Sequence, residues 1–180
     1  MDDLNKLMIE QLRDAYSAET QGLRTMSQLA KKASSQALKE ALQTHAEETE
    51  GQVERLEKAL EMLGGRPGRK VCEAMRGILE EAQQELEDQE KGAVYDMLLV
   101  ASIQKVEHYE IASYGTITAL GKAAGQQELT NLLVQTLQEE KKTDELLTQL
   151  AEREVNPAAI QAMQEPDAAN DKRGGSKKSA

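Results

Sequence analysis

Four segments of this 180-residue chain carry apolar residues at alternating three- and four-residue spacing. The spacing predicts long amphipathic helices at about residues 3–32, 36–63, 91–120 and 126–153. Alanine, leucine, glutamate, glutamine and lysine, which favour helices, are abundant, whereas only three prolines occur. No alternating apolar–polar run is long enough for a strand. The chain is therefore predicted to be all-α.

Residues that break helices separate these segments. Two serines at 34–35 supply a break and an N-cap between the first and second helices. The second helix is followed at 64–68 by the sequence GGRPG, which ends it. Gly121 is the expected C′ residue of the third helix, and Asn-Pro at 156–157 is expected to stop the fourth or start a short turn.

The connection between the second and third helices is the long one, at about 27 residues. Part of it, residues 71–86, carries apolar residues at helical spacing and is expected to form a shorter helix. Short loops make antiparallel neighbours, whereas a long connection lets the chain return along the bundle. We therefore expect a ferritin-like four-helix bundle with a crossover that contains a short helix. A short helix packed across one end of a plain up-down bundle is the alternative.

Acidic residues interrupt the middle of every apolar stripe. They are, in chain order, Glu19, Glu48, Glu107, Glu110, Glu140 and Asp144. In the third and fourth helices the acidic pairs are three and four residues apart, so each pair shares one face. Burying one unpaired carboxylate costs several kcal/mol. The cost of burying six unpaired carboxylates would exceed the roughly 5–15 kcal/mol that stabilises a domain. Either these carboxylates reach water, therefore, or cations neutralise them.

Counting along the helices places these acidic residues at similar heights. Glu19 and Glu48 lie about 14 or 15 residues on either side of the first loop, which at about 1.5 Å per residue is the same level of an antiparallel pair. In the second hairpin the heights of Glu110 and Glu140 along the helix axes differ by roughly 6 Å. This difference is smaller if part of the loop is non-helical or if Glu107, rather than Glu110, faces Glu140. The alternative is that the acidic residues lie at the stripe edges and reach water. Interruption of all four helices at matched depth favours the buried arrangement.

Composition excludes several classes of protein. The chain has 22 basic and 32 acidic residues, a net charge of −10, and neither phenylalanine nor tryptophan, which disfavours nucleic-acid binding. No apolar run reaches the roughly 18 residues of a membrane span, and no signal peptide is visible. The single cysteine, Cys72, has no partner for an internal disulfide. We expect a cytoplasmic protein without a membrane partner.

The predicted organisation is one bundle domain at 1–155 and a C-terminal extension at 156–180. The end of the extension is poor in apolar residues and carries four basic residues within 172–178, so it is expected to be a mostly disordered basic tail. We interpret it as a solubilising tail. Weak contact with anionic polymers is the alternative, which the net charge of −10 opposes.

Several short segments of the chain match one family. Residues 104–115 read QKVEHYEIASYG, and in this segment the chain strongly resembles the YciF/YciE family of bacterial ferritin-like stress proteins. The resemblance extends to YSAE at 16–19, HAEET at 45–49, CEAM at 72–75 and EEK at 139–141. It covers about residues 3–156 and is most specific in the third helix.

The resemblance implies a ferritin-like bundle, homodimeric, with a dinuclear metal site in its core. The metal ligands that it implies are Glu19, Glu48, Glu107, Glu110, Glu140 and Asp144. Ferritin-like proteins carry a histidine three residues after the second-helix glutamate, but this chain has Gly51 there. His45, one turn before that glutamate, or Gln52, one turn after it, is expected to replace the missing ligand. Glu48 with Glu107 or Glu110 are the expected bridging ligands.

Glu19 and Glu140 are the expected terminal ligands. A site so rich in oxygen favours two iron ions, with manganese or zinc as alternatives. The expected function is that of a stress-response di-iron protein that oxidises ferrous iron or consumes peroxide. Its expected partners are metal ions and small oxidants. A non-catalytic metal-binding or structural bundle that acts as an interaction protein is the alternative.

Overall fold

The computed structural model describes residues 3–164, and all the secondary-structure elements of this part are helices. The α-helices are α1 (Asp3–Leu29), α2 (Gln36–Met62), α3 (Glu73–Glu87), α4 (Ala93–Ala123), α5 (Gln127–Leu150) and α6 (Asn156–Gln164). A short 3₁₀ turn, Ala30–Lys32, follows α1, and a π-helical stretch, Ala151–Val155, joins α5 to α6. The all-α prediction is confirmed.

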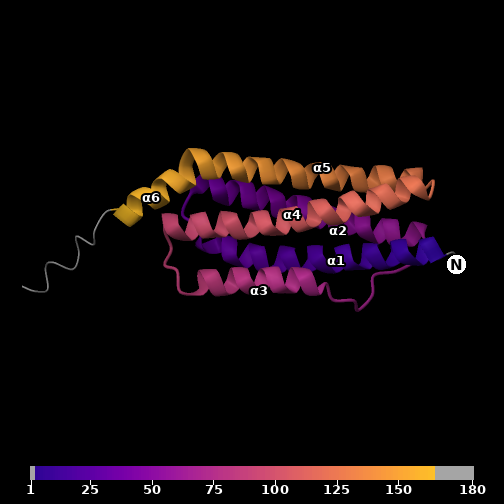
Figure 1. Ribbon diagram of the computed structural model, residues 1–180. Coiled ribbons are helices and arrows are strands. Elements are labelled where there is room, and N and C mark those ends of the chain that lie inside the picture. Colours follow the sequence, from indigo (N-terminus) through magenta and orange to yellow (C-terminus); the bar gives the residue numbers. More distant parts are fainter. Residues whose placement is uncertain (1–2, 165–180) are drawn as a thin grey trace, which may run out of the picture.

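Helices α1, α2, α4 and α5 form the bundle, in which α1 packs on α2 and α4, and α5 packs on the same two helices (Figure 1). Helix α3 lies outside this bundle, along α1 and α4. The chain leaves α2 at one end of the molecule, returns through α3 and starts α4 at the other end. The expected crossover is therefore confirmed, and α3 runs along the bundle rather than across its end.

The start of α2 is fixed by side chains from two parts of the sequence. Ser35 is its N-cap, as expected, because its Oγ accepts a hydrogen bond from the Leu38 amide at 3.1 Å. Asp96, a buried carboxylate on α4, accepts hydrogen bonds from the Ser34 and Ser35 amides, each at 2.7 Å. This contact joins the α1–α2 turn to the beginning of α4 at one end of the bundle.

Helix α4 ends later than the sequence predicts. It continues to Ala123, and Gly125, with a φ of 70°, is the C′ residue, so the predicted end at Gly121 was wrong. Gly121 instead lies at the contact between α4 and α5, where an added Cβ would be 2.5 Å from the Thr130 hydroxyl oxygen. The glycine is there because the two helices approach too closely for a side chain.

The helical path also continues past the predicted stop at Asn156 and Pro157. Asn156 opens α6, and Pro157 occupies its first turn, where a missing amide hydrogen costs little. Helix α6 packs against α4, and its Ala159 is buried. Of the two alternatives, the stop was wrong, because the π-helical stretch redirects the chain without ending the helical path, and the start of a short further segment at Asn156 agrees with α6. Residues 165–180, the predicted basic tail, lie outside the described residues.

The apolar core is divided into two clusters along the bundle. One gathers around α3, the starts of α2 and α4 and the end of α5, and includes Leu38, Met75, Leu99, Ile103 and Leu147. The other gathers at the opposite end and includes Met8, Leu12, Leu56, Leu60 and Leu133. The interrupting acidic residues of the sequence fall between these clusters. Within residues 3–164 no helix is long and apolar enough to cross a membrane.

The close contact at Gly121 gives a stability prediction. Replacing Gly121 by alanine forces the buried Thr130 to move, and we expect the free energy of unfolding in urea to fall by about 1–3 kcal/mol. The double variant G121A/T130A should recover part of this loss. The matched control is G115A, because nothing lies within 4 Å of a Cβ at that helical position. A G121A protein as stable as the wild type would contradict the close approach.

Candidate metal centre

Four carboxylates lie buried between the two core clusters. Glu19 comes from α1, Glu107 and Glu110 from α4, and Glu140 from α5. Their exposed fractions are 1%, 0%, 3% and 0%. Their helices bury the apolar residues on either side, so these acidic side chains cannot avoid the interior. The requirement derived from the sequence, that the carboxylates be buried and not at the stripe edges, is therefore met by these four residues.

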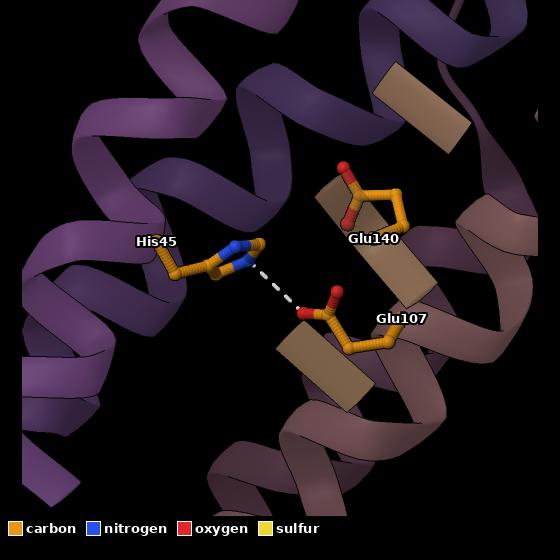
Figure 2. A group of neighbouring side chains, drawn as sticks. All are labelled: His45, Glu107 and Glu140. Atoms are coloured by element: carbon orange, nitrogen blue, oxygen red, sulfur yellow. Dashed lines mark ion pairs between the residues drawn. The ribbon is translucent and has the colours of Figure 1, made fainter. Parts of the chain in front are cut away.

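The buried side chains form two overlapping groups that can each hold a metal ion. His45, Glu107 and Glu140 form one group, and Figure 2 shows their polar ends turned toward one another from three helices (Figure 2). Glu19, Glu110 and Glu140 form the other. Within each group the candidate ligand atoms all lie within 4.8 Å of one another. Glu140 belongs to both groups, so the structure places this residue to bridge two ions, whereas the sequence predicted it as a terminal ligand and Glu48 with Glu107 or Glu110 as the bridging ones.

Hydrogen bonding leaves part of this cluster unsatisfied. As ionised groups, the buried Glu107 and Glu140 find no hydrogen-bond donor for their carboxylate oxygens, and only a proton on one of them allows a hydrogen bond to the other. Glu19 differs, because its Oε1 accepts a hydrogen bond from the buried Tyr114 hydroxyl at 2.5 Å. Buried carboxylate oxygens without donors are strongly unfavourable in a stable protein. Bound cations would satisfy them.

His45 reaches the cluster from α2. Its Nε2 lies 3.0 Å from Glu107 Oε1, an ion-pair distance without the direction of a hydrogen bond. Its Nδ1 lies 3.3 Å from the Thr143 hydroxyl on α5, one turn after Glu140. A hydroxyl on Nδ1 fixes the orientation of the ring and leaves Nε2 directed at the carboxylates. This is the arrangement by which proteins orient a histidine ligand.

Burial and mutual repulsion keep these carboxyl groups protonated in the metal-free protein. Burial, followed by the Glu140 charge, raises the pKa of Glu19 to about 8. Burial also raises the pKa of Glu107 to about 8. The pKa values of Glu110 and Glu140 are raised well above their usual range, first by burial and then by the neighbouring carboxylates. The cluster therefore releases protons when a cation binds.

Two of the predicted ligands lie outside both groups. Glu48 is partly exposed and pairs with Lys142 Nζ at 3.3 Å, so on α2 it is His45 that faces the buried carboxylates. Asp144 is also partly exposed, accepts a hydrogen bond from Gln104 at 3.1 Å and lies 3.2 Å from His108 Nε2. A residue count along two helices gives the height of a side chain but not its direction, which explains both differences.

Gln52, the other candidate for the missing second-helix ligand, is fully buried. Its Nε2 donates to Glu139 Oε2 at 3.3 Å, whereas its Oε1 has no hydrogen-bond partner. Gln52 is not a member of either group of candidate ligands. The structure therefore brings His45, and not Gln52, into the cluster.

Sequence reasoning missed the polar residues that support the cluster. Arg55 pairs with Glu139, and its Nε donates to the buried Thr136 hydroxyl at 2.9 Å, which links α2 to α5. Thr143 supports His45, as described above. A signal existed for Thr143, because it lies three residues after Glu140 and so shares its face. No signal identified Arg55, because its partners lie more than eighty residues away along the chain.

The donor set fits a pair of divalent cations. Four buried carboxylates carry four negative charges when ionised, and two divalent ions carry four positive charges. The two groups share one residue, as neighbouring ions with a common ligand require. The unsatisfied oxygens of Glu107 and Glu140 are the atoms that cations would occupy. The residues present therefore fit a dinuclear metal centre.

Fold and site together define a class: a ferritin-like four-helix bundle with buried carboxylates and one histidine at its centre. Residues 3–160 match the family described as Domain of unknown function (DUF892). The chain belongs to this family, in agreement with the YciF-like resemblance of the sequence.

The relatives span nearly the whole chain. Protein YciF of Escherichia coli (strain K12) is 44% identical over 160 residues, which are 88% of this chain and 96% of YciF. The crystal structure of the E. coli stress protein YciF matches with a TM-score of 0.80, covering 87% of this chain and 99% of that one. YcfI from Rhodopseudomonas palustris is 35% identical with a TM-score of 0.77, covering 82% and 94% of the two chains.

A more distant match carries the fold alone. It is a structure of ferritin-like, diiron-carboxylate proteins from Bacillus anthracis str. Ames, 18% identical with a TM-score of 0.66, covering 83% of this chain and 99% of that one. The expected ferritin-like topology is thereby confirmed.

The raised pKa values predict an unusual pH dependence of stability for the metal-free protein. A folded-state pKa of about 8 for Glu19 and Glu107, against 4.5 ordinarily, means that the folded state binds protons more tightly. Its stabilisation is complete below about pH 4.5 and is lost as the pH rises toward 8. We expect the free energy of unfolding to fall by a few kcal/mol between about pH 5 and pH 8.

The measurement is urea unfolding of chelator-treated protein at a series of pH values. E107Q should flatten the dependence, because the glutamine stays neutral throughout. E145Q, which changes an exposed acidic residue of α5, should keep the wild-type slope. Stability that rises between pH 5 and pH 8 would contradict the buried, protonated cluster.

Proposed function

We propose that this protein is a dinuclear metal-carboxylate protein that binds two iron ions and oxidises ferrous iron with a small oxidant. The observation that carries this proposal is the pair of overlapping ligand groups with the shared Glu140 and the unsatisfied oxygens of Glu107. A purely structural bundle gains nothing from burying four carboxylates. It would be more stable with apolar residues at these positions.

The ligand types favour iron or manganese. One ion would be held by His45, Glu107 and Glu140, and the second by Glu19, Glu110 and Glu140. Carboxylate-rich sites with one imidazole suit iron and manganese better than copper or zinc. A ferrous pair held there would supply two electrons, enough with two protons to reduce one hydrogen peroxide to two waters or one dioxygen to hydrogen peroxide.

The protein's own residues orient the ligands and control protons. Thr143 holds the His45 ring, and Tyr114 donates to Glu19 and fixes that carboxylate. The carboxyl groups give up their protons as the site fills, so loading depends on pH. The apolar clusters on both sides keep bulk water from the centre, which strengthens each charge interaction inside it.

A relative supports a proposal for the physiological setting. The E. coli YciF that matches over most of this chain is described as a stress protein. We propose that this chain likewise acts under stress, by removing ferrous iron together with an oxidant. Homodimer formation and a cytoplasmic location stay predictions from the sequence.

Because Glu140 belongs to both ligand groups, its substitution is predicted to weaken binding of both metal ions. In an anaerobic titration monitored by elemental analysis, the wild type should bind two ferrous ions per chain. E140Q removes a charge from both groups and should weaken both sites at least tenfold, whereas E110Q should leave one ion bound. E145Q is the matched control and should bind as the wild type does. E140Q that still binds two ions with unchanged affinity would contradict the bridging role.

The rate of iron oxidation distinguishes a catalytic metal site from a purely structural one. Ferrous-loaded wild type mixed with dioxygen or hydrogen peroxide should form ferric ion at least tenfold faster than the same iron in buffer. E107Q should lose most of this acceleration, because one ligand of the first group becomes neutral. Two bound ions with no acceleration would show the non-catalytic alternative, a bundle that metal only stabilises.

A further inference from the structure

A cavity of about 30 Å³ lies between α1, α2 and α4 and reaches the buried cluster. Glu19, Glu110 and His45 line it, so three side chains of the two ligand groups face the same space. Its remaining walls are mostly apolar and include Leu23, Met26, Leu42, Ala46 and Val106. The cavity is therefore the space through which a molecule can contact the candidate metal ligands.

The cavity adjoins the molecular surface between α1 and α2. A surface hollow of about 430 Å³ shares Ser27, Ala30, Leu42 and Ala46 with it. Ser27, Ala30 and Ala46 are partly exposed, whereas Glu19 and Glu110 at the inner side are buried. The surface hollow and the cavity therefore adjoin at these shared residues, which mark a candidate path from solvent, between the first two helices, to the carboxylates.

The charges and walls along this path favour an uncharged molecule. Lys31 and Lys39 line the surface hollow and disfavour entry of a metal cation. The carboxylates at the inner side disfavour an anion. Apolar walls penalise any ion, because desolvating it costs far more than desolvating a neutral molecule. A hydrated ferrous ion is therefore a poor fit to this route.

The size of the cavity limits the molecule further. A water needs roughly 10–15 Å³ of such space, so about 30 Å³ holds a molecule of two heavy atoms but not a branched organic one. Dioxygen and hydrogen peroxide have this size and carry no charge. An organic hydroperoxide with an aromatic group does not fit.

Gly22 keeps this space open. It is buried on α1 and lines the cavity, and a Cβ at this position would lie 3.8 Å from both Glu110 Oε1 and Val106 Cγ1. These are ordinary contact distances, so alanine fits without strain and its methyl group fills part of the cavity. Glycine in the interior of a long helix is otherwise unfavourable, which indicates that the space itself is needed.

We propose that this cavity is the entry route of a small uncharged oxidant, dioxygen or hydrogen peroxide, and that Gly22 sets its width. The proposal rests on the proposed function, because it names the oxidant class of the same site. Larger peroxides are therefore excluded by the small size of the cavity between α1 and α2.

The kinetic test uses ferrous-loaded full-length protein mixed with dioxygen, hydrogen peroxide or cumene hydroperoxide in separate experiments. Each rate is divided by the rate of free ferrous iron with the same oxidant. For the wild type, this ratio should be at least tenfold lower with cumene hydroperoxide than with the faster of the two small oxidants. G22A should load two ions but react with that oxidant at least fivefold more slowly.

The matched control is G77A on α3, since nothing lies within 4 Å of a Cβ there, and it should behave as the wild type. A fully loaded G22A protein that reacts at the wild-type rate would overturn the proposal. The proposal would also be overturned if the protein accelerated iron oxidation by cumene hydroperoxide as much as iron oxidation by hydrogen peroxide. The faster of the two small oxidants identifies which one the route serves.

A second test does not depend on catalysis. Dissolved dioxygen is paramagnetic and enhances the relaxation of methyl groups that it contacts, so it can be followed by NMR in metal-free protein. Met26 and Ala46 should show an enhancement several times that of Leu60, which is buried in the other cluster, and G22A should reduce it. Equal enhancement at all three methyl groups would overturn the route, even if the loaded protein oxidises no iron and the proposed function fails.

Discussion

The electrostatic cost of four carboxylates in one interior region governs this structure. Each would lose several kcal/mol by leaving water unpaired, and each raises the proton affinity of the others. The metal-free protein limits the cost by holding protons, as the pKa of about 8 for Glu19 and Glu107 indicates. Two divalent cations would remove it by matching the charge. The same side chains therefore destabilise the metal-free protein and would stabilise a metal-bound one.

The bundle is arranged around this constraint. The apolar residues separate into two clusters, one at each end, and the polar centre lies between them. Helix α4 supplies two of the four carboxylates and packs against α1, α3, α5 and α6, so it is covered on most sides. Such coverage holds Glu107 and Glu110 in position, because the backbone that carries them cannot shift without disturbing several helix contacts.

Much of this architecture could be predicted from the sequence, and the failures have physical causes. Periodicity locates helices because it reports burial directly, and Ser35 and GGRPG at 64–68 act through local hydrogen bonds. The predicted end of α4 at Gly121 was wrong because a glycine can be required either at a helix end or at a close contact between two helices. Glu19, Glu107, Glu110 and Glu140 were recognisable as charges on an apolar face.

The sequence pattern did not predict which side chain of α2 faces the buried carboxylates. His45 and Glu48 lie one turn apart on α2, the first reaching Glu107 on α4 and the second Lys142 on α5, and spacing alone cannot tell which of them joins the cluster. The choice depends on contacts with distant residues such as Thr143 and Lys142, which only the folded chain brings near.

The origin of the ligands has a kinetic consequence. In each group, one residue comes from the α1–α2 hairpin and two come from the α4–α5 hairpin. An ion in either group therefore cross-links two halves of the molecule that the sequence connects only through α3. A bound ion would hold the two hairpins together through its ligands, so that separating the hairpins would break metal–ligand bonds. A cation bound in this way would slow the opening of the bundle between the two hairpins, and it would itself leave more slowly than from a site built within one hairpin.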